Sequence, residues 1–513
     1  MLYPIGIQSF ESIREGGYVY VDKTHLIHQL ATTGKYYFLS RPRRFGKSLL
    51  VSTMEAYFQG KKDLFKGLAI EKLEKVWAEY PVLHLDLSGK TYNKAEDLEM
   101  LLDMHLCRWE KAFDMQTRYS EPDIRFQTLI DTAYEKTGKP VVILIDEYDK
   151  PLLDSAGNEE LREAYRSRLQ GFYSVMKTRD GKIRFGFLTG ITKLGKLSVF
   201  SGLNNLNDIS MDWEFSGICG ISEKELHTCF DQEVSAMAQA NRLTKEECYA
   251  KLKDYYDGYH FCDGAEDIYN PFSLLSALRK KRFSDYWYET GTPTFVVKAL
   301  RSGKFNLEDL TLEGVPASAL GGVNADDSDP VPVLYQSGYL TIKSYDERWE
   351  RYTLKYPNKE VERGFMQGLA NIYVPSMRYN SPFDVQKFVE DFEKGDAESL
   401  MKRFEAFFAD ADYEIVGDAE LYFQNTMYVM CKLMGQYTQV ERHTSNGRMD
   451  IVVQTDKYVY IMELKMDAGA DEALQQIEDK GYAKPFAADA RRIFKIGVGF
   501  SSETRRIKEW KMA

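Results

Sequence analysis

The sequence lacks the features that mark membrane, secreted and disulfide-rich proteins. Its longest purely aliphatic run, Val141 to Ile145, is far shorter than the ~20 apolar residues that a membrane span needs. The opening MLYPIGIQSF has no basic stretch followed by an apolar core, so we expect no signal peptide. The 6 cysteines are scattered without a C-x-x-C pair. This spacing argues against structural zinc and a disulfide framework, and it favours the reducing cytoplasm.

An excess of positive charge is also absent. Lys and Arg number 67 and Asp and Glu number 78, so the formal net charge is −11. A polybasic coat for nucleic acid is therefore excluded, and any binding to a phosphate backbone requires a local concentration of cations. The remaining composition, 44% hydrophobic and 28% charged, is typical of globular proteins. At roughly 150 residues per domain, 513 residues predict three to four domains.

The first 200 residues alternate apolar runs with segments of helical spacing. Helical segments such as 49–58 and 98–113 separate the runs. Nearly continuous apolar strands separated by helices indicate an α/β fold with a parallel sheet covered on both faces. The predicted strands are 36–40, 82–87, 141–145 and 184–189.

The rest of the chain changes character twice. Residues from about 220 to 310 are mostly helical, and a loop rich in Gly, Ala, Asp and Pro follows at 315–332. Two alternating runs in 339–356, around Asp346 and Glu347, predict a β-hairpin, which with the preceding helices would form a winged helix. After a helical stretch at 359–412, mixed α and β patterns return. They predict a helix near 419–434, strands near 449–454 and 458–464, a helix near 470–483 and a strand near 493–500.

The segment YYFLSRPRRFGKSLLVSTM (36–54) predicts a strand, a tight loop and a helix that binds phosphate. Amide groups at a helix N-terminus bind phosphate oxygens, helped by the helix dipole. Gly46 would let the backbone approach the ligand, Lys47 would reach the β- and γ-phosphates, and Ser48 would bind Mg²⁺. Gly-Lys-Ser alone is also compatible with an ordinary helix start. The expected nucleotide contacts are Arg44, Phe45, Gly46, Lys47 and Ser48.

The run VVILIDEYDK (141–150) predicts the second half of a nucleotide site. A buried strand would deliver Asp146 to the Mg²⁺ shell and Glu147 to the attacking water, at the sheet edge where ligands bind. The alternative is a strand that ends in a solvated acidic turn, which the order of the two motifs disfavours. In the next strand, Thr189 and Thr192 could sense the γ-phosphate or be ordinary strand-end threonines.

Several motifs together make the first 290 residues similar to the bacterial AAA-ATPase-like family. These are the opening 5–27 with its YVDKT, then SRPRRFGKSLL, LIDEYDKP, the stretch 187–210, YDGYHF and YNPFSLL. The resemblance implies a P-loop core, a helical lid and often a winged helix. It also implies ATP and Mg²⁺ binding through Lys47, Ser48, Asp146 and Glu147.

Other residues of these motifs have open roles. The general P-loop pattern has Gly where this chain has Arg41, but the family carries RPRRFGKS. Arg41, Arg43 and Arg44 could bind phosphate, contact a neighbouring subunit or pair with acidic side chains. Nothing in the sequence gives a role to Tyr20, Asp22 and Lys23 of YVDKT, and a structural cover over the sheet edge is the alternative.

The segment GRMDIVVQTDKYVYIMELKMD (447–467) places carboxylates and a lysine on two neighbouring strands. Alternation puts Glu463 and Lys465 on one face of a strand, and Asp450 joins them if the two strands pair across a turn at 455–457. Hard oxygen ligands suit Mg²⁺ or Mn²⁺, and the lysine would orient water or stabilise developing charge. The alternative is a surface ion pair on an edge strand.

This arrangement resembles the PD-(D/E)XK nuclease superfamily over about residues 415–505. The following helix carries Gln476, Lys480 and Tyr482 like that superfamily's version in this ATPase family, and Glu420 is a further candidate metal ligand beside Asp450. From Arg491 to Lys511, seven Lys and Arg stand against two Glu. Such a run would form a basic rim for phosphates or a solvated terminal helix.

The leading hypothesis is an ATP-controlled, metal-dependent nuclease with Glu147, Asp450, Glu463 and Lys465 as catalytic residues. Its expected partner is nucleic acid, DNA favoured over RNA, with a homo-oligomer possible and no membrane. The alternative is a nucleotide-dependent switch whose C-terminal domain binds without cutting. The predicted domains are a P-loop core at 1–215, a lid at 216–300, a winged helix at 301–357, a connector at 358–412 and a nuclease-like domain at 413–513.

Overall fold

The computed structural model divides the chain into two compact units. The first is Met1–Lys298 with Thr311–Val361, and the second is Ala299–Leu310 with Glu362–Ala513. In the described part of the chain, no helix combines the length and apolar character needed to cross a bilayer. The residues described are 1–116, 119–193, 205–287, 307, 314–320, 330–373, 385–409, 419–435, 439–445, 448–504 and 506–513.

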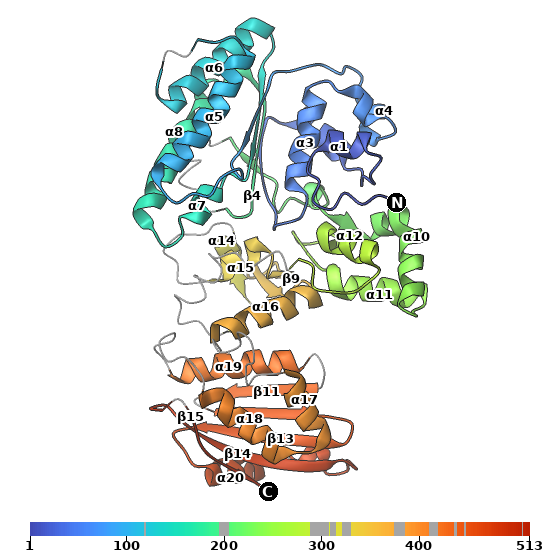
Figure 1. Ribbon diagram of the computed structural model, residues 1–513, viewed down its shortest axis with the longest axis vertical. Helices are drawn as coiled ribbons and strands as arrows, with labels where there is room; N and C mark the ends of the chain where they lie inside the picture. Colours follow the sequence, from blue (N-terminus) through green and yellow to red (C-terminus); the bar gives the residue numbers. More distant parts are fainter. Residues whose placement is uncertain are drawn as a thin grey trace. The chain divides into compact units, whose positions relative to one another are not determined.

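A parallel sheet forms the core of the first unit and confirms the predicted α/β class. Its strand order is β2-β3-β4-β1-β5. Helices α1, α3 and α4 lie on one side of it and α5, α6 and α8 on the other (Figure 1). All six residues of β3 are buried, as a strand covered on both faces requires. The bounds are β1 Tyr36–Ser40, β2 Val82–Asp86, β3 Val141–Asp146, β4 Ile183–Gly190 and β5 Asn207–Asp208; α1 Phe10–Glu15, α2 Thr24–Thr33, α3 Lys47–Phe58, α4 Ala69–Leu73, α5 Ala95–Ala112, α6 Pro122–Thr137, α7 Lys150–Asp154 and α8 Glu159–Thr178.

Three helices with strong N-caps follow the sheet. They are α10 (Glu223–Ala240), α11 (Lys245–Tyr256) and α12 (Pro271–Lys280), with the short strands β6 (Ile221–Ser222) and β7 (Ile268–Tyr269). Ser222 and Thr244 each form a capping box with a glutamate three residues later, which fixes where α10 and α11 begin. Asn270 accepts from the backbone N–H groups of Phe272 and Ser273 and so starts α12.

The predicted hairpin is present in the first unit. Strands β9 (Thr341–Asp346) and β10 (Arg351–Lys355) pair antiparallel, and β8 (Val315–Pro316) adds to β10. The short helices α14 (Ala317–Leu320) and α15 (Val331–Ser337) precede it. Gly338 ends α15 with a φ of 89°, and a Cβ there would lie 2.6 Å from Cβ of Pro42. The hairpin module therefore packs directly against the loop that follows β1.

A mixed sheet with strand order β11-β12-β13-β14-β15 forms the second unit. Its central strands and helices agree with the sequence prediction, whereas β11 and β15 were not predicted. Residues 506–512 form an edge strand, not the solvated helix considered for this basic run, because they pair with β14. The bounds are α16 Lys359–Tyr373, α17 Val385–Lys394, α18 Ala397–Ala409, α19 Ala419–Met434, β11 Gln439–Ser445, β12 Arg448–Gln454, β13 Tyr458–Met466, α20 Ala470–Lys480, β14 Arg492–Ser501 and β15 Arg506–Met512.

Helices α17 and α18 belong to the packing of the second unit. The Tyr460 hydroxyl on β13 donates to the carbonyl of Phe392 on α17, at 2.9 Å. Phe408 on α18 packs edge-on against Phe500 on β14, with ring centroids 5.2 Å apart. These helices, which the sequence suggested as a connector, therefore cover one face of this sheet.

Candidate functional site

The loop between β1 and α3 has the backbone geometry of an anion site. Gly46 sits at the N-cap of α3 with a φ of 93°, and a Cβ built there would meet open space. No side chain caps α3, so its first amide groups are left for a ligand. The positive end of the helix dipole reinforces the attraction for an anion. Lys47, Ser48 and Leu49 all line the adjoining cavity.

Lys47 and Ser48 connect this loop to the end of β3. The Lys47 amine donates to the carbonyls of Arg41 at 3.0 Å and Pro42 at 3.2 Å. Burial, the largest effect, raises the pKa of the Asp146 carboxyl, and Ser48 acts in the opposite direction and lowers it. A hydroxyl at the start of α3 and a buried carboxyl at the end of β3 are both hard oxygen donors, which suit a divalent cation.

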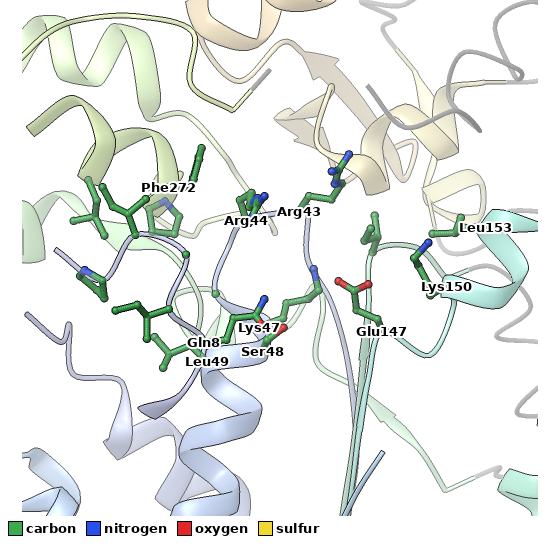
Figure 2. A pocket seen from close by; sticks show the side chains of 18 of the residues that line it. Gln8, Arg43, Arg44, Lys47, Ser48, Leu49, Glu147, Lys150, Leu153 and Phe272 are labelled. Carbon is green, nitrogen blue, oxygen red and sulfur yellow. The ribbon is translucent and has the colours of Figure 1, made fainter. Parts of the chain in front are cut away.

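Glu147 holds an unusual backbone conformation beside this pair. Its φ of 53° lies in the left-handed region, which costs a residue other than glycine on the order of 1–3 kcal/mol. Its amide donates to Asp146 Oδ1 at 3.1 Å. Figure 2 shows Glu147 between the loop residues Lys47 and Ser48 on one side and Lys150 on the other. With this backbone conformation, Glu147 lines the cavity together with Lys47 and Ser48 of the predicted phosphate site.

The cavity has a volume of about 780 Å³ and mixes apolar and charged walls. Arg43, Arg44, Lys47 and Lys150 supply positive charge and Glu147 supplies negative charge (Figure 2). Asp154 also lines the cavity and forms an ion pair with Lys150, at 2.6 Å. The apolar wall consists of Pro4, Ile5, Ile7, Leu49, Pro271, Phe272 and Leu275. This combination can hold an apolar ring at one end and phosphates at the other.

Sequence reasoning missed most of these walls. Residues 5–8 belong to the opening motif 5–27 that carries the family resemblance, but that motif assigned them no role. Phe272 had one usable signal, because Asn270 and Pro271 mark a helix start, but the helix start does not say what it faces. Arg44 shows the connection: its guanidinium lies over the Phe272 ring at 5.1 Å from the centroid. The loop after β1 therefore contacts α12 directly.

Arg41 has none of the three roles considered for it. It is 1% exposed and its guanidinium donates to the carbonyls of Ser40, Ser210 and Phe215 at 2.9, 2.7 and 3.2 Å. It also lies over the Phe261 ring, 4.0 Å from the centroid. Carbonyl oxygens replace the expected phosphates and carboxylates, so Arg41 ties the loop to the chain that follows β5.

Thr189 of β4 and Thr192, two residues after the strand ends, do not line the cavity. Thr189 and Thr192 are fully buried and neither is among the residues that line it, whereas Ile191 is. The Thr192 hydroxyl donates to Asp149 at 2.8 Å. A γ-phosphate contact by Thr189 stays a prediction.

The YVDKT stretch has a structural role in the described geometry. Asp22 accepts from the amide and hydroxyl of Thr24 and from the amide of Ala69 on α4. The Lys23 amine lies 2.6 Å from Glu225 on α10. The stretch therefore joins the segment before β1 to α4 and to the helices after the sheet.

The second predicted site depends on the pairing of β12 and β13, which is antiparallel as expected. Asp450 stands directly opposite Glu463, and Arg448 opposite Lys465. The turn at 455–457 is closed by a hydrogen bond from the Thr455 amide to the Tyr458 carbonyl, at 2.9 Å. The side chains of Asp450 and Glu420 lie outside the described part of the chain.

Helix α20 covers the face that carries Glu463 and Lys465. Gly497 of β14 is paired in register with Glu463. A Cβ at Gly497 would come within 2.3 Å of the Ala470 carbonyl oxygen on α20. Glu463 is fully buried, and the Lys465 amine lies 2.8 Å from the Glu472 carboxylate of α20. The predicted edge-strand alternative is wrong, because β13 is the central strand of its sheet.

The remaining predicted residues of this site are distributed around α20. Gln476 is half-buried, and its amide nitrogen has no hydrogen-bond partner in the described structure. Lys480 is exposed at the helix end and Tyr482 is half-buried beyond it. Among the described side chains, no three His, Cys, Asp or Glu residues form a metal-binding group. The predicted basic rim is partly neutralised, because Arg491, Lys495 and Lys511 form ion pairs with Asp489, Glu478 and Asp471.

Comparison with known proteins agrees with both halves of this description. A family model described as "Predicted AAA-ATPase" matches residues 4–200, and a model of the PD-(D/E)XK nuclease superfamily matches residues 418–510. The chain is also similar to an "Uncharacterized protein in vnfD 5'region" of Azotobacter chroococcum mcd 1. The two are 36% identical over 518 residues, which cover 98% of this chain and 97% of that protein. The chain therefore belongs to the AAA-ATPase-like family, with a C-terminal domain of the PD-(D/E)XK nuclease superfamily.

Proposed function

We propose that this protein binds and hydrolyses ATP and that its C-terminal domain cleaves nucleic acid with a divalent cation. The observation that carries the first part is that Ser48, Glu147 and four cations line one cavity at the N-terminus of α3, which no side chain caps. Binding of a triphosphate with Mg²⁺ needs backbone amides and positive charge for the phosphate oxygens and oxygen ligands for the cation.

In the proposed ATP site each residue has a separate task. The first amides of α3 and the Lys47 amine would bind the β- and γ-phosphates, and the apolar wall around Phe272 would hold the base. Ser48 and Asp146 would hold Mg²⁺, while Glu147 would orient the attacking water and accept its proton. A divalent cation, when bound, supplies positive charge that stabilises the phosphoryl oxygens.

In the proposed nuclease site, Asp450 and Glu463 would hold the cation and Lys465 would stabilise charge on the phosphate. The support is the register that pairs Asp450 with Glu463. Carboxylates are hard oxygen donors, which suit a divalent cation. We favour DNA as the substrate, in the cytoplasm.

Two variants of the full-length protein test the ATP site. Glu147→Gln should bind a fluorescent ATP analogue with unchanged affinity and lose hydrolysis by roughly 100-fold or more, the usual contribution of a general base. Lys47→Met should lose binding itself. Glu135→Gln, on an exposed position of α6, is the matched control. Wild-type hydrolysis rates in Glu147→Gln would remove the assignment.

Cleavage of DNA and RNA, with Mg²⁺ or Mn²⁺ and with or without ATP, tests the second site. We expect Asp450→Asn and Lys465→Met to abolish it and Asp456→Asn to retain it, because Asp456 lies exposed in the turn between the same two strands. Cutting that survives Asp450→Asn would contradict the proposed site.

A second candidate function is a nucleotide-dependent switch whose C-terminal domain binds a partner or nucleic acid without cutting it. Two observations favour it: Glu463 is fully buried, and Lys465 is engaged by Glu472. This candidate predicts that the protein binds ATP and cleaves nothing with any metal. It also predicts that Asp450→Asn leaves the heat of metal binding, measured by calorimetry, unchanged.

A further inference from the structure

The turn that carries Glu147 is held to the end of β4 by two hydrogen bonds from the next residue, Tyr148. The Tyr148 amide donates to the carbonyl of Thr189 at 3.0 Å. Its phenol hydroxyl donates to the carbonyl of Thr192, also at 3.0 Å. Tyr148 is fully buried. The turn therefore cannot shift along β4 without breaking both hydrogen bonds.

Asp149 adds a second set of bonds to the same segment. Its carboxylate accepts from the Ile191 amide at 3.1 Å, from the Thr192 amide at 2.7 Å and from the Thr192 hydroxyl at 2.8 Å. The fit is tight, because a Cβ at Gly190 would lie 2.5 Å from Asp149 Oδ1 and 2.7 Å from the Tyr148 ring. A buried carboxylate with three donors is strongly oriented.

The residues around Asp149 face the cavity while Asp149 does not. Glu147 and Lys150 line the cavity from the turn, and Ile191 lines it from the end of β4. Asp149 is 1% exposed and is absent from the lining. It therefore cannot touch a bound nucleotide, and any effect on the reaction must pass through the segments that it joins.

We propose that Asp149 is a positioning residue for ATP hydrolysis, which fixes the left-handed turn at Glu147 against the end of β4. The proposal rests on the ATPase activity proposed above. A residue at φ 53° keeps that conformation when its surroundings over-determine it, and here the bonds of the two residues that follow it do so. Without them the Glu147 carboxylate would leave the water-activating position and the amide of Ile191 would be released beside it.

The experiment compares nucleotide binding and turnover in full-length variants. In Asp149→Ala the carboxylate and all of its bonds to Ile191 and Thr192 are lost. We expect kcat for ATP to fall roughly 10- to 100-fold, since small misplacements of catalytic groups have effects of this size. We expect KM, and the Kd of a fluorescent ATP analogue, to stay within about threefold, because the residues that bind phosphate are untouched.

A second pair of variants keeps the test independent of the carboxylate itself. Thr192→Val removes one donor to Asp149 and should lower kcat several-fold, whereas Thr192→Ser retains the hydroxyl and should restore turnover to near the wild-type value. Asp131→Asn is the control, because Asp131 pairs with Arg179 and Lys182 away from the cavity. A merely structural loss would lower the stoichiometry of analogue binding in proportion to kcat and would show no difference between serine and valine, whereas the positioning role leaves that stoichiometry at the wild-type value.

The outcomes separate the two proposals. Asp149→Ala and Thr192→Val with wild-type kcat, while Glu147→Gln is inactive, would overturn the positioning role and leave the ATPase intact. Equal effects of Thr192→Val and Thr192→Ser would also overturn it. A wild-type protein that binds ATP and never hydrolyses it would remove the proposed activity, and the positioning role with it.

Discussion

Arg41 in the loop after β1 and Lys47 at the start of α3 both donate to backbone carbonyls, but of these two only Lys47 lines the cavity. The guanidinium of Arg41 is enclosed by backbone carbonyls and the Phe261 ring. The Lys47 amine bonds to two carbonyls of the loop itself, and phosphate oxygens could replace these as acceptors. The planar fork of arginine suits a fixed cluster of acceptors, and the flexible stem of lysine suits a ligand that comes and goes.

At the same scale, buried carboxyls make the first unit sensitive to pH. Burial raises the pKa of Glu360 to about 8 and that of Asp257 to about 7. The folded protein holds these protons more tightly than the unfolded chain. This stabilisation is complete below the ordinary pKa of a carboxyl and is lost as the pH rises through 7 and 8. For Glu360 the loss is on the order of 5 kcal/mol.

We therefore expect Glu360→Gln to flatten the pH dependence of stability. Glutamine cannot ionise, and its oxygen can still accept from the Trp287 amide, which Glu360 Oε1 meets at 2.6 Å. The thermal unfolding midpoint of the wild type should fall between pH 6 and pH 9 by more than that of the variant. Glu347→Gln, exposed in the hairpin turn, should behave like the wild type, and parallel profiles for all three would contradict the prediction.

At the scale of elements, glycines decide how closely segments approach. Gly258 of the YDGYHF motif has a φ of 88°, and a Cβ there would lie 2.1 Å from the carbonyl oxygen of Pro357. The next residue, Tyr259, packs edge-on against Phe45 at 4.7 Å between ring centroids. The Trp287 indole donates to the Arg43 carbonyl at 3.1 Å. The motif thus packs against the phosphate-binding loop through Tyr259 and Phe45, and none of its residues lines the cavity.

Gly497 plays the same part for helix α20 in the second unit. An added methyl group would meet the Ala470 carbonyl at 2.3 Å and the Leu474 amide at 2.9 Å, which are backbone atoms that cannot rotate away. We expect Gly497→Ala to destabilise the second unit by about 1–3 kcal/mol, as overpacking does. Chemical unfolding followed by far-ultraviolet circular dichroism measures it.

Gly171 provides the matched control. It lies on α8, where an added Cβ meets no atom within 4 Å. Gly171→Ala should be neutral or stabilising by up to about 1 kcal/mol, since alanine favours a helix. Equal effects of the two substitutions would mean that α20 is not held against Gly497.

At the scale of the whole molecule, the two proposed sites belong to different compact units. We therefore expect Asp450→Asn to leave ATP hydrolysis, measured without nucleic acid, within about twofold of the wild type, because the two sites share no residue and such sites act independently. A tenfold loss of hydrolysis with unchanged thermal stability would show that the chemistry of the second unit feeds back on the first.

Most of the fold could be predicted because it follows local rules. Apolar runs predicted the four main strands of the first sheet, and Gly46 with Lys47 and Ser48 marked the loop before α3. Edge strands β11 and β15 escaped prediction. They carry charged residues and little alternation, and it is pairing with a neighbouring strand that makes them strands.

What the sequence by itself determined are the motifs and the order of their elements, since periodicity and helix-start signals act within a few residues. Tertiary structure decided which side chains meet. It buried Arg41, a candidate phosphate ligand, and bonded it to the Ser210 carbonyl, and it brought Phe272 to the cavity. It also joined Asp149 to Thr192, 43 residues later. Such contacts depend on packing between segments distant in the chain, and no local pattern encodes them.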